Sequence, residues 1–583
     1  MALTNQEIAD IFNNIADMLE IQGENRFKFL SYRRAGETLG ELPRDLQAYV
    51  DDGTLTDIPG IGKAISDKIK ELLETDKLEF YEKLRAQVPE SILQIKGING
   101  VGPKKAKLFW NELNITTVES LQTAASEGKL RELPGMGAKS EQKIIESIQA
   151  LSRNRGRTPI GNAKQAADTI LAELVALPQV EEAMIAGSIR RGKTTIGDVD
   201  ILAVSDDAEP IMAHFVGMGR VERILGQGPT KSSIELRTGL QVDLRVLPRE
   251  RFGTALQYFT GSKDHNVRIR EIALNKGYSL NEHALRPIDD AGNMLDESHY
   301  VYCGTEEDVY EKIGLPWIAP ELREDQGEIE AAIAGKLPNL ITAEDILSDL
   351  HMHTTWSDGT LSIREMAEAA RERGKTHIVI TDHSKRNIVA NGLDGERLLQ
   401  QQAEVRAVNE EMGDDFHVLH GVEMDILEDG DMDLSDDILA QLDFVVASLH
   451  FGLTQDRALI TKRLLNALNN PHVDCIGHMT GRLIGTRPSA DVDFDAVFEA
   501  ALETDTVLEI NANPARLDLD AQYARRAHQL GIKLAINTDA HSIKMMDMLP
   551  YGILTARRAW AEPENVINTW AFDRFYAWIQ SRA

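Results

Sequence analysis

At 583 residues the chain is too long for one hydrophobic core, so about three to five domains are expected. Charged residues at 27%, hydrophobic residues at 42%, two cysteines, no apolar run of about 18 residues and no signal peptide together indicate a cytoplasmic protein without disulfides or a membrane partner. The net charge of −30 excludes DNA binding through a bulk positive field, but residues 1–155 hold 21 Lys and Arg against 24 Asp and Glu, so local contacts with DNA are possible there.

A repeated form runs through the first part of the chain: "DIPGIGKAISDKI" (57–69), "IKGINGVGPKKAKLF" (95–109) and "LPGMGAKSEQKI" (133–144). Each copy has an apolar residue, a Gly-x-Gly turn and a helix with lysines. The glycines let a phosphate approach the backbone, and the helix N-terminus offers free N–H groups. The form resembles the helix-hairpin-helix motif, which binds DNA backbone without reading sequence; the alternative is plain helix packing. The candidate DNA-binding glycines are Gly60, Gly62, Gly100, Gly102, Gly135 and Gly137.

The next part of the chain carries paired carboxylates. A helix (163–176) precedes the strand "EAMIAGS", and then comes "GSIRRGKTTIGDVDIL" (187–202). Alternation along a strand puts Asp198 and Asp200 on one face, where they repel each other unless a cation lies between them. The arginines beside the Gly-Ser turn suit a polyanionic phosphate. Carboxylates with Mg²⁺ facing phosphate-binding groups are the layout of phosphoryl or nucleotidyl transfer.

A third carboxylate lies in a predicted hairpin. "IELRTGLQVDLRVL" (234–247) places Asp243 in the second arm, between Val242 and Leu244. A charge on an apolar strand is costly unless it is paired or bound to a metal. Alone, Asp243 would be interpreted as an edge-strand carboxylate; with Asp198 and Asp200 it completes a three-carboxylate metal site.

Three stretches, "GSIRRGKTTIGDVDIL", "VDLRVLP" and "YFTGSKDHNVRIR" (258–270), resemble the family X DNA polymerases, relatives of polymerase beta, over roughly residues 1–315. The Gly-Ser and Asp-x-Asp frame alone also resembles nucleotidyltransferases that act on antibiotics or tRNA ends, but the hairpin repeats and "YFTGS" favour DNA. The resemblance implies that Asp198 and Asp200 bind two Mg²⁺ or Mn²⁺ ions, and that Asp243 joins at the metal that activates the primer 3′-hydroxyl.

The same resemblance implies a nucleotide pocket. Ser188 and Arg191 would hold the triphosphate of the incoming deoxynucleotide, and Tyr258, Phe259, Asn266 and Arg270 would line its sugar and base. The full set of candidate nucleotide-binding residues is Arg157, Gly187, Ser188, Arg191, Tyr258, Phe259, Gly261, Asn266 and Arg270.

The N-terminal segment resembles the lyase domain of this family, in which a lysine forms a Schiff base with the sugar of an incised abasic site. Lys68 stands at the matching position, while Ala64 replaces a second lysine of the family pattern. Lys28 and Tyr32 would hold the 5′-phosphate. The alternative is that Lys68 is a solvated helix lysine.

Beyond residue 336 the chain is rich in histidine, with 11 of its 15 histidines. Histidines and carboxylates recur at the ends of apolar runs, as in "LHMHTTWSDG", "IVITDHS" and "LAINTDAH". Parallel strands that alternate with helices form a barrel whose C-terminal loops converge on one site. Imidazole and carboxylate without thiolate suit Mn²⁺, Zn²⁺ or Fe. The candidate ligands are His351, His353, Asp358, His383, Glu423, His450, His478, Asp539 and His541.

This part resembles the PHP domain (polymerase and histidinol phosphatase), over about residues 336–575. The resemblance implies a distorted seven-stranded barrel, up to three metal ions and phosphoester hydrolysis. The remaining polar residues of this part are interpreted as structural or as supporting the ligands: His377, Asp382, His417, His420, His472 and His528.

The predicted fold is therefore multidomain, α+β and α/β. The expected boundaries are a helical lyase-like domain (1–88), a helix-hairpin-helix subdomain (89–156), a nucleotidyltransferase palm with an antiparallel or mixed sheet (157–250), a nucleotide-selection subdomain (251–320), a linker (321–340) and a (β/α)7 PHP barrel (341–583).

The expected function is gap filling in base-excision repair by a monomeric polymerase that uses gapped or nicked DNA and deoxynucleoside triphosphates. The PHP domain would add a 3′–5′ exonuclease, and abasic-site endonuclease and lyase activities are further expectations. Two alternatives stay open: a PHP phosphoesterase that the front half targets to DNA ends, and a non-catalytic DNA-end scaffold.

Overall fold

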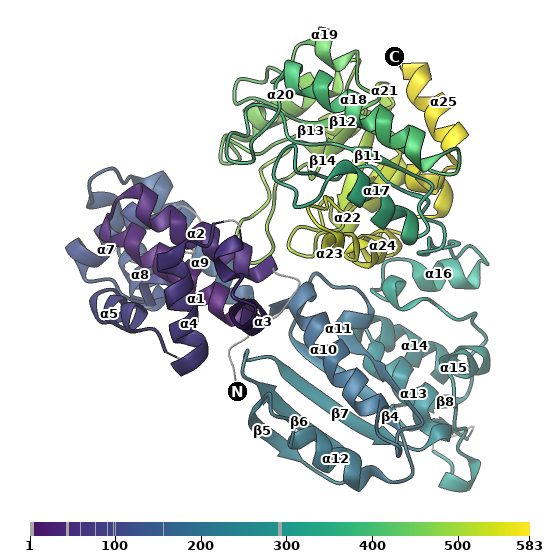
Figure 1. The fold of residues 1–583 in the computed structure, drawn as a ribbon. Coiled ribbons are helices and arrows are strands. Elements are labelled where there is room, and N and C mark those ends of the chain that lie inside the picture. Colours follow the sequence, from purple (N-terminus) through teal and green to yellow (C-terminus); the bar gives the residue numbers. More distant parts are fainter. Residues whose placement is uncertain are drawn as a thin grey trace. The chain divides into compact units, whose positions relative to one another are not determined.

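The computed structural model describes residues 5–41, 46–58, 60–75, 77–89, 91–96, 98, 101–154, 157–289 and 294–582. The chain divides into two compact units, Met1–Arg155 and Gly156–Ala583, which are drawn together in Figure 1. Among the described residues, no helix is both long enough and apolar enough to cross a bilayer.

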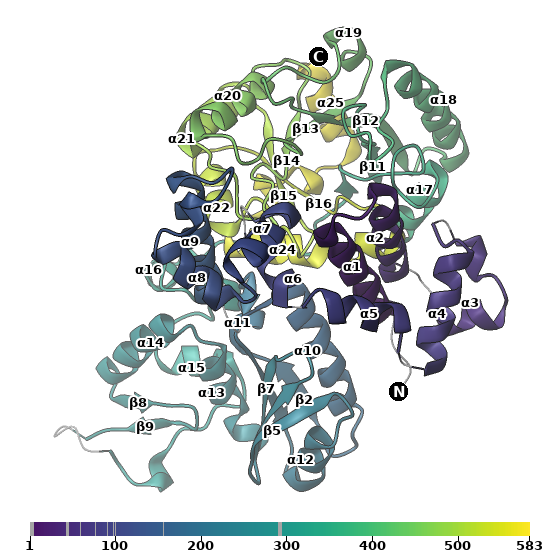
Figure 2. The same cartoon turned by 90° about the vertical axis from the view of Figure 1, so that its left-hand side faces the viewer.

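The first unit is helical in its described part. Helices α1 and α2 pack along each other, as Figure 2 shows, and their buried faces belong to one apolar core shared with the later helices. Helix α7 illustrates the local cause of a boundary: Pro103 follows the N-cap Gly102, and the helix ends at Leu113, before the C-cap Asn114, which has a positive φ of 51°. The helices are α1 (Asn5–Gln22), α2 (Arg26–Glu41), α3 (Leu46–Asp51), α4 (Lys63–Thr75), α5 (Glu79–Gln87), α6 (Ser91–Lys96), α7 (Pro103–Leu113), α8 (Val118–Ser126) and α9 (Ala138–Asn154), with short 3-10 turns η1 (Leu55–Asp57) and η2 (Leu130–Glu132).

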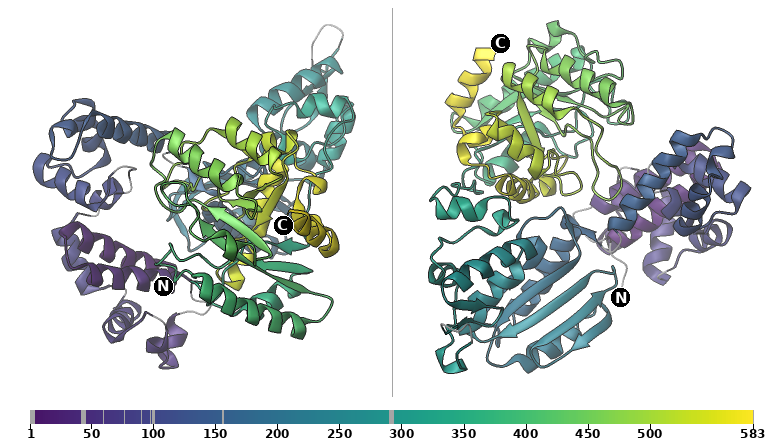
Figure 3. Two further views of the ribbon diagram at one scale, coloured as in Figure 1. Left: turned by 90° about the horizontal axis from the view of Figure 1, so that it is seen from above. Right: turned by 180° about the vertical axis from the view of Figure 1, so that it is seen from behind.

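The second unit begins with a five-stranded mixed sheet in the order β2-β4-β7-β6-β5, seen from behind in the right panel of Figure 3. Strands β4 and β7 run parallel, and the other neighbours are antiparallel. The odd residues of β4 pack with α10 and α12, whereas Leu202 and Val204 pack with α13. The elements are β1 (Thr158–Pro159), α10 (Ile160–Val175), β2 (Glu182–Ile185), α11 (Gly187–Arg190), β3 (Thr195–Ile196), β4 (Asp198–Val204), α12 (Ala208–Val216), β5 (Val221–Gln227), β6 (Lys231–Leu236), β7 (Gln241–Leu247) and α13 (Arg249–Thr260).

A smaller helical region follows the sheet. It contains α14 (Lys263–Asn275), β8 (Tyr278–Leu280), β9 (Leu285–Pro287), η3 (Glu297–His299), α15 (Glu306–Lys312), η4 (Pro320–Leu322) and α16 (Glu328–Ile333). The segment 321–340, expected to be a linker, is folded at its start. Arg323 is fully buried and donates hydrogen bonds to Glu306 at 2.6 and 3.1 Å, so its charge is neutralised inside the core.

The rest of the chain forms a barrel of seven parallel strands in sequential order, β10 to β16, surrounded by helices (Figure 1). This confirms the predicted fold class. The strands are β10 (Ser348–Asp349), β11 (His377–Ile380), β12 (His417–Asp425), β13 (Phe444–Ser448), β14 (Cys475–Gly477), β15 (Val507–Asn511) and β16 (Leu534–Asn537). The helices are α17 (Ile363–Glu372), α18 (Gly395–Met412), α19 (Asp436–Leu439), α20 (Arg457–Leu468), α21 (Phe494–Glu503), α22 (Ala521–Gln529), α23 (Ile543–Met546), α24 (Leu549–Arg558) and α25 (Phe572–Arg582), with η5 (Pro563–Asn565) and η6 (Ile567–Thr569).

The first and last strands of the barrel meet along a seam. Near it, Met352 forms a bridge with Ala540, and the Asp349 carboxylate accepts hydrogen bonds from the backbone N–H and the hydroxyl of Thr538. Neighbouring strands elsewhere are joined by ladders, five residue pairs long between β12 and β13. The barrel is therefore nearly closed, and its two chain ends meet at one place.

Candidate active sites

Three carboxylates gather at one end of the mixed sheet. Asp198 is the first residue of β4, and Asp200 pairs in parallel register with Asp243 on β7. All three lie on the face opposite the main apolar core, because the alternating neighbours Val199, Ile201 and Val242 belong to that core. Strand alternation thus brings the three predicted carboxylates together.

The electrostatics of this cluster fit a divalent cation. Burial, followed by the charges of Asp198 and Asp243, raises the pKa of Asp200 to about 7. The nearest balancing groups of Asp243 are the Gln241 amide, which donates at 2.9 Å, and the Lys231 ammonium at 3.6 Å. Neighbouring carboxylates that resist ionising together are stabilised by a bound cation, and oxygen ligands suit Mg²⁺ or Mn²⁺.

The turn at the start of α11 requires glycine. Gly187 has a positive φ of 67°, and a Cβ there would lie 3.0 Å from the Asp200 carboxylate. Of the two arginines on this turn, Arg190 is committed to the interior through a bidentate pair with Glu306 at 2.9 and 2.8 Å. Arg191 binds Glu324 through Nε at 3.0 Å and also borders the cavity described next.

A cavity of about 690 Å³ opens beside the carboxylates. Its lining includes every residue that the sequence resemblance assigned to the nucleotide, together with Asp198 and Asp200. Lys193, Thr195 and Lys263 also line it and were missed, although all three lie inside the motifs that carry the resemblance. The predicted residues in the lining are Arg157, Gly187, Ser188, Arg191, Tyr258, Phe259, Gly261, Asn266 and Arg270.

The far wall of the cavity is held by local contacts at the end of α13. The Asn266 amide donates to the Tyr258 carbonyl at 2.7 Å, and Arg270 donates to the Asn266 carbonyl at 3.2 Å. Phe259 lies under the Arg245 guanidinium, 4.1 Å from its ring centroid. This wall offers aromatic and amide surface, while the Gly187–Arg191 side offers positive charge.

The predicted lyase residues lie in the first unit. Lys68, on α4, has its ammonium 5.3 Å from the Phe80 ring centroid and 6.0 Å from that of Tyr32, and it donates to the Ala64 carbonyl at 3.2 Å. Tyr32 is buried against Phe80. Lys28 precedes it by one turn of α2 and pairs with Glu24 at 3.3 Å on the surface.

The described hairpin glycines stand before helix starts. Gly60 and Gly62 precede α4, Gly102 caps α7, and Gly135 and Gly137 precede α9. A Cβ placed on any of the last four would meet nothing within 4 Å, so these turns are open to a partner. The predicted Gly100 lies outside the described residues.

The second cluster lies at the C-terminal ends of the barrel strands. At least one candidate ligand lies on or after each strand except β15, so the parallel topology brings them together from positions far apart in sequence. In strand order they are His351 and His353 with Asp358 after β10, His383 after β11, Glu423 on β12, His450 after β13, His478 after β14, and Asp539 with His541 after β16.

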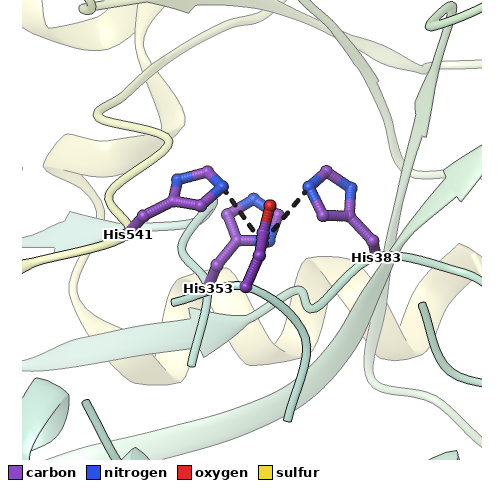
Figure 4. Close-up of side chains that lie close together, drawn as sticks. His353, His383 and His541 are labelled. Carbon is purple, nitrogen blue, oxygen red and sulfur yellow. Dashed lines mark ion pairs between the residues drawn. The ribbon is translucent and has the colours of Figure 1, made fainter. Parts of the chain in front are cut away.

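These ligands form three overlapping groups whose donor atoms lie within 4.8 Å of one another. In Figure 4, His353 lies between His383 and His541, with ring centroids 4.3 and 4.1 Å away. The groups are His353, Asp358, His383 and His541; His351, His353 and Asp539; and His383, Glu423 and His450. His478 joins them through Glu423, at 2.9 Å.

Orphaned polar atoms show that this cluster fits metal ions. Among the residues that the structure describes, both carboxylate oxygens of Glu423 are buried without a hydrogen-bond partner, as are Nε2 of His351 and Nδ1 of His478. Buried polar atoms normally have partners, and a bound cation supplies one. Burial, followed by the nearby His541 and His383, also lowers the pKa of His353 to about 4, so its ring is neutral and able to bind metal.

A supporting layer fixes the imidazole rings. Glu509 lies 2.8 Å from Nδ1 of His351, and Asp425 lies 2.9 Å from Nδ1 of His450. Neither carboxylate was singled out from the sequence. "VLEIN" could have revealed Glu509, because it places a carboxylate near the end of an apolar strand, as "GVEMD" does for Glu423.

In the part of the chain that the structure describes, the residues interpreted as structural or as supporting the ligands do not belong to the three candidate metal-binding groups. Asp382 accepts hydrogen bonds from the hydroxyls of Thr354 and Ser357. The others contact the barrel's own packing: His377 lies against Phe575, His417 stacks on Phe572, His420 contacts Gln401, His472 donates its backbone N–H to Asn470, and His528 contacts the Ala559 carbonyl.

The sequence matches four protein families along its length. They are a helix-hairpin-helix domain over residues 3–78, a SAM-like helix-hairpin-helix tandem over 92–150, the DNA polymerase beta thumb over 255–324 and the PHP domain over 349–513. Together with the two clusters, these matches define a class: a polymerase beta-type fold with DNA-binding hairpins, joined to a PHP domain.

The curated relatives refine that class. DNA polymerase/3'-5' exonuclease PolX of Bacillus subtilis is 39% identical over 565 residues, which are 97% of each chain. The DNA polymerases lambda of Rattus norvegicus and Arabidopsis thaliana are 25% and 28% identical, each over 55% of this chain and over 56% and 62% of their own lengths. The chain therefore belongs to the PolX family, the family X polymerases that carry a C-terminal PHP domain.

Proposed function

We propose that this chain fills short gaps in DNA by adding deoxynucleotides at the three-carboxylate site. It also degrades 3′ ends at the PHP centre, the cluster of histidines and carboxylates at the C-terminal ends of the barrel strands. Both activities serve base-excision repair. The observation that carries the proposal is the coexistence of two separate clusters, each fitted to cations, with a cavity of about 690 Å³ beside the first. The substrates would be gapped or nicked DNA and deoxynucleoside triphosphates.

At the polymerase site, Asp198, Asp200 and Asp243 would hold two Mg²⁺ or Mn²⁺ ions. When bound, such ions lower the pKa of the primer 3′-hydroxyl and neutralise the attacking and leaving oxygens. Ser188 and Arg191 would orient the triphosphate by hydrogen bonds and charge. Tyr258 and the neighbouring aromatic wall would exclude water from the sugar and base.

At the PHP centre, the histidine and carboxylate groups would hold up to three Mn²⁺, Zn²⁺ or Fe ions. When bound, these would supply a hydroxide nucleophile and polarise the phosphodiester. Glu509 and Asp425 would keep the His351 and His450 rings oriented. Arg516, whose Nε is 3.9 Å from the Asp539 carboxylate, would offer a positive charge to the phosphodiester.

In the first unit, Lys68 is the proposed Schiff-base lysine of a lyase activity. Its position supports this role, because its ammonium lies 6.0 Å from the ring centroid of Tyr32, one of the two residues proposed to hold the 5′-phosphate, and 5.3 Å from that of Phe80. The Gly-x-Gly hairpins would bind the DNA backbone through main-chain N–H groups.

Reciprocal variants test the two-site proposal on a one-nucleotide-gapped DNA and a labelled 3′ end. Asp198→Ala with Asp200→Ala should abolish extension and leave 3′-end degradation intact. His353→Ala with His541→Ala should remove degradation and bound transition metal while gap filling with Mg²⁺ continues. His472→Ala is the matched histidine control and should change neither. Degradation that survives in the double-histidine variant would place hydrolysis elsewhere, and extension that survives without Asp198 and Asp200 would refute the polymerase site.

A further inference from the structure

Helix α24 of the barrel also packs against the polymerase fold. On one side it contacts β15 and β16, the strands that approach the PHP centre. On the other side, Tyr551 and Leu554 pack against the apolar core of the five-stranded mixed sheet, the predicted palm. Gly192, in the turn after α11, lies so close that an added Cβ would be 2.5 Å from Leu554. The PHP barrel therefore contacts the turn that carries the triphosphate-binding candidates.

The last residue of α24 adds a polar contact to the same turn. Arg558 donates through Nη1 to the backbone carbonyl of Arg191, and the same nitrogen lies 3.1 Å from the Glu324 carboxylate. Glu324 in turn accepts a hydrogen bond from Nε of Arg191 at 3.0 Å and lies 3.3 Å from the ammonium of Lys193. The side chains of Arg558, Glu324 and Arg191 are only 13 or 14% exposed, so solvent screens this network weakly.

One carboxylate therefore serves three cations. Two of those cations, Arg191 and Lys193, line the nucleotide cavity, and Arg558 does not. Because Arg558 takes part of the Glu324 charge, the cavity side of the network keeps an excess of positive charge. Without Arg558, Glu324 would pair more fully with Arg191 and compete with a triphosphate for it.

We infer that Arg558, a residue of the PHP domain, is a positioning residue for nucleotide addition, holding the α11 turn by its carbonyl and sharing Glu324 so that Arg191 and Lys193 face the incoming triphosphate. The inference rests on the proposed polymerase function. It gives the PHP domain a part in polymerisation that is separate from its own metal centre.

Arg557 provides a matched control on the same helix. It binds the Glu321 carboxylate at 2.7 Å and donates to the Ile341 carbonyl at 2.9 Å. Among the described residues, its contacts include neither Arg191 nor Glu324. Loss of its side chain removes a comparable, mostly buried ion pair without touching the α11 turn.

The experiment measures gap filling by the full chain over a range of deoxynucleotide concentrations, with 3′-end degradation on the same preparations. Arg558→Ala should raise KM for the deoxynucleotide about tenfold, the size expected for one lost charge-assisted interaction, with a smaller change in kcat. Arg558→Lys should recover part of the loss, and Arg557→Ala should leave KM unchanged. Unaltered 3′-end degradation would show that the barrel is intact.

A wild-type KM in Arg558→Ala, or an equal rise in Arg557→Ala, would overturn the inference. If the alanine variant also lost 3′-end degradation, Arg558→Gln would decide, since it keeps a polar hydrogen-bond donor on a shorter side chain and removes the charge. A normal KM in that variant would also overturn the inference. Wild-type protein that fails to extend a primer would instead refute the proposed function, so the two failures are distinguishable.

Discussion

Asp200 and Asp243 face each other as register partners on the parallel strands β4 and β7, with Asp198 two residues away on the same face. Their mutual repulsion helps raise the pKa of Asp200 to about 7, after the larger effect of burial. Such a cluster favours the binding of a cation, because a bound cation stabilises the ionised form of the neighbouring carboxylates.

Asp243→Asn should therefore lower the rate of nucleotide addition by at least about 100-fold, since it removes one of the three carboxylates proposed to hold the two metal ions. In metal-free protein the same change should lower the pKa of Asp200, because one neighbouring negative charge is removed. Single-nucleotide incorporation and carboxyl NMR titration measure the two effects. Full activity in the Asn variant would show that Asp243 holds no catalytic cation.

Glu509→Gln tests the support of the PHP centre. The carboxylate lies 2.8 Å from Nδ1 of His351 and accepts the backbone N–H of His478 at 2.7 Å, so it orients two candidate ligands. We expect metal affinity and 3′-end degradation to fall about 10- to 100-fold, with gap filling unchanged. Metal content after dialysis provides the readout. Glu503→Gln, an exposed glutamate on α21, is the control and should have no effect.

The buried carboxylate of Glu306 predicts a pH dependence of stability. Burial would raise the pKa of Glu306, but the charges of Arg323 and Arg190 outweigh it and lower this pKa to about 2. Because the folded-state pKa lies below the unfolded one, the stabilisation is complete above about pH 4.5 and is lost as the pH falls towards 2.

Glu306→Gln should accordingly lower the free energy of unfolding by about 3 kcal/mol at pH 7, because it leaves two buried guanidinium groups without their counter-charge. The difference from wild type in urea unfolding should shrink as the pH falls below 4.5. Glu307→Gln, its exposed neighbour, serves as the control. A difference that stays constant down to pH 2 would contradict the ion-pair explanation.

The hairpin glycines with positive φ predict a loss of DNA affinity that is independent of sequence. Gly60 and Gly135 have φ of 83° and 74°, so valine at either position strains the turn and covers the backbone N–H groups. Binding should weaken about tenfold for all DNA sequences alike in an anisotropy titration. Gly53→Val has comparable strain (φ 73°) outside the hairpins and should leave affinity unchanged. Equal losses in all three variants would mean general misfolding.

Local periodicity explains why much of each site could be predicted. Asp198 and Asp200 share a face because a strand alternates, and His383 or His450 reach the centre because parallel strands end on one side. Contacts between distant segments could not be predicted from the sequence. Glu324, for example, shares its charge with Arg558, which lies 234 residues later. Arg323 sits in a polar stretch that suggested a linker, yet it is buried beneath Glu306.

The seam of the barrel, where its first and last strands meet, lies at the PHP centre. His353 precedes the first helix of the barrel and Asp539 follows its last strand, and the two side chains meet at 3.1 Å where the ring of strands lacks a full ladder. An ion bound by both side chains would link the segment after the first barrel strand to the segment after the last one. Hydrogen exchange at the His353 amide, which donates to the Ala540 carbonyl, would then slow on metal loading far more than exchange within the continuous β12–β13 ladder. Binding of metal at the nuclease centre and stabilisation of the barrel seam would then occur together.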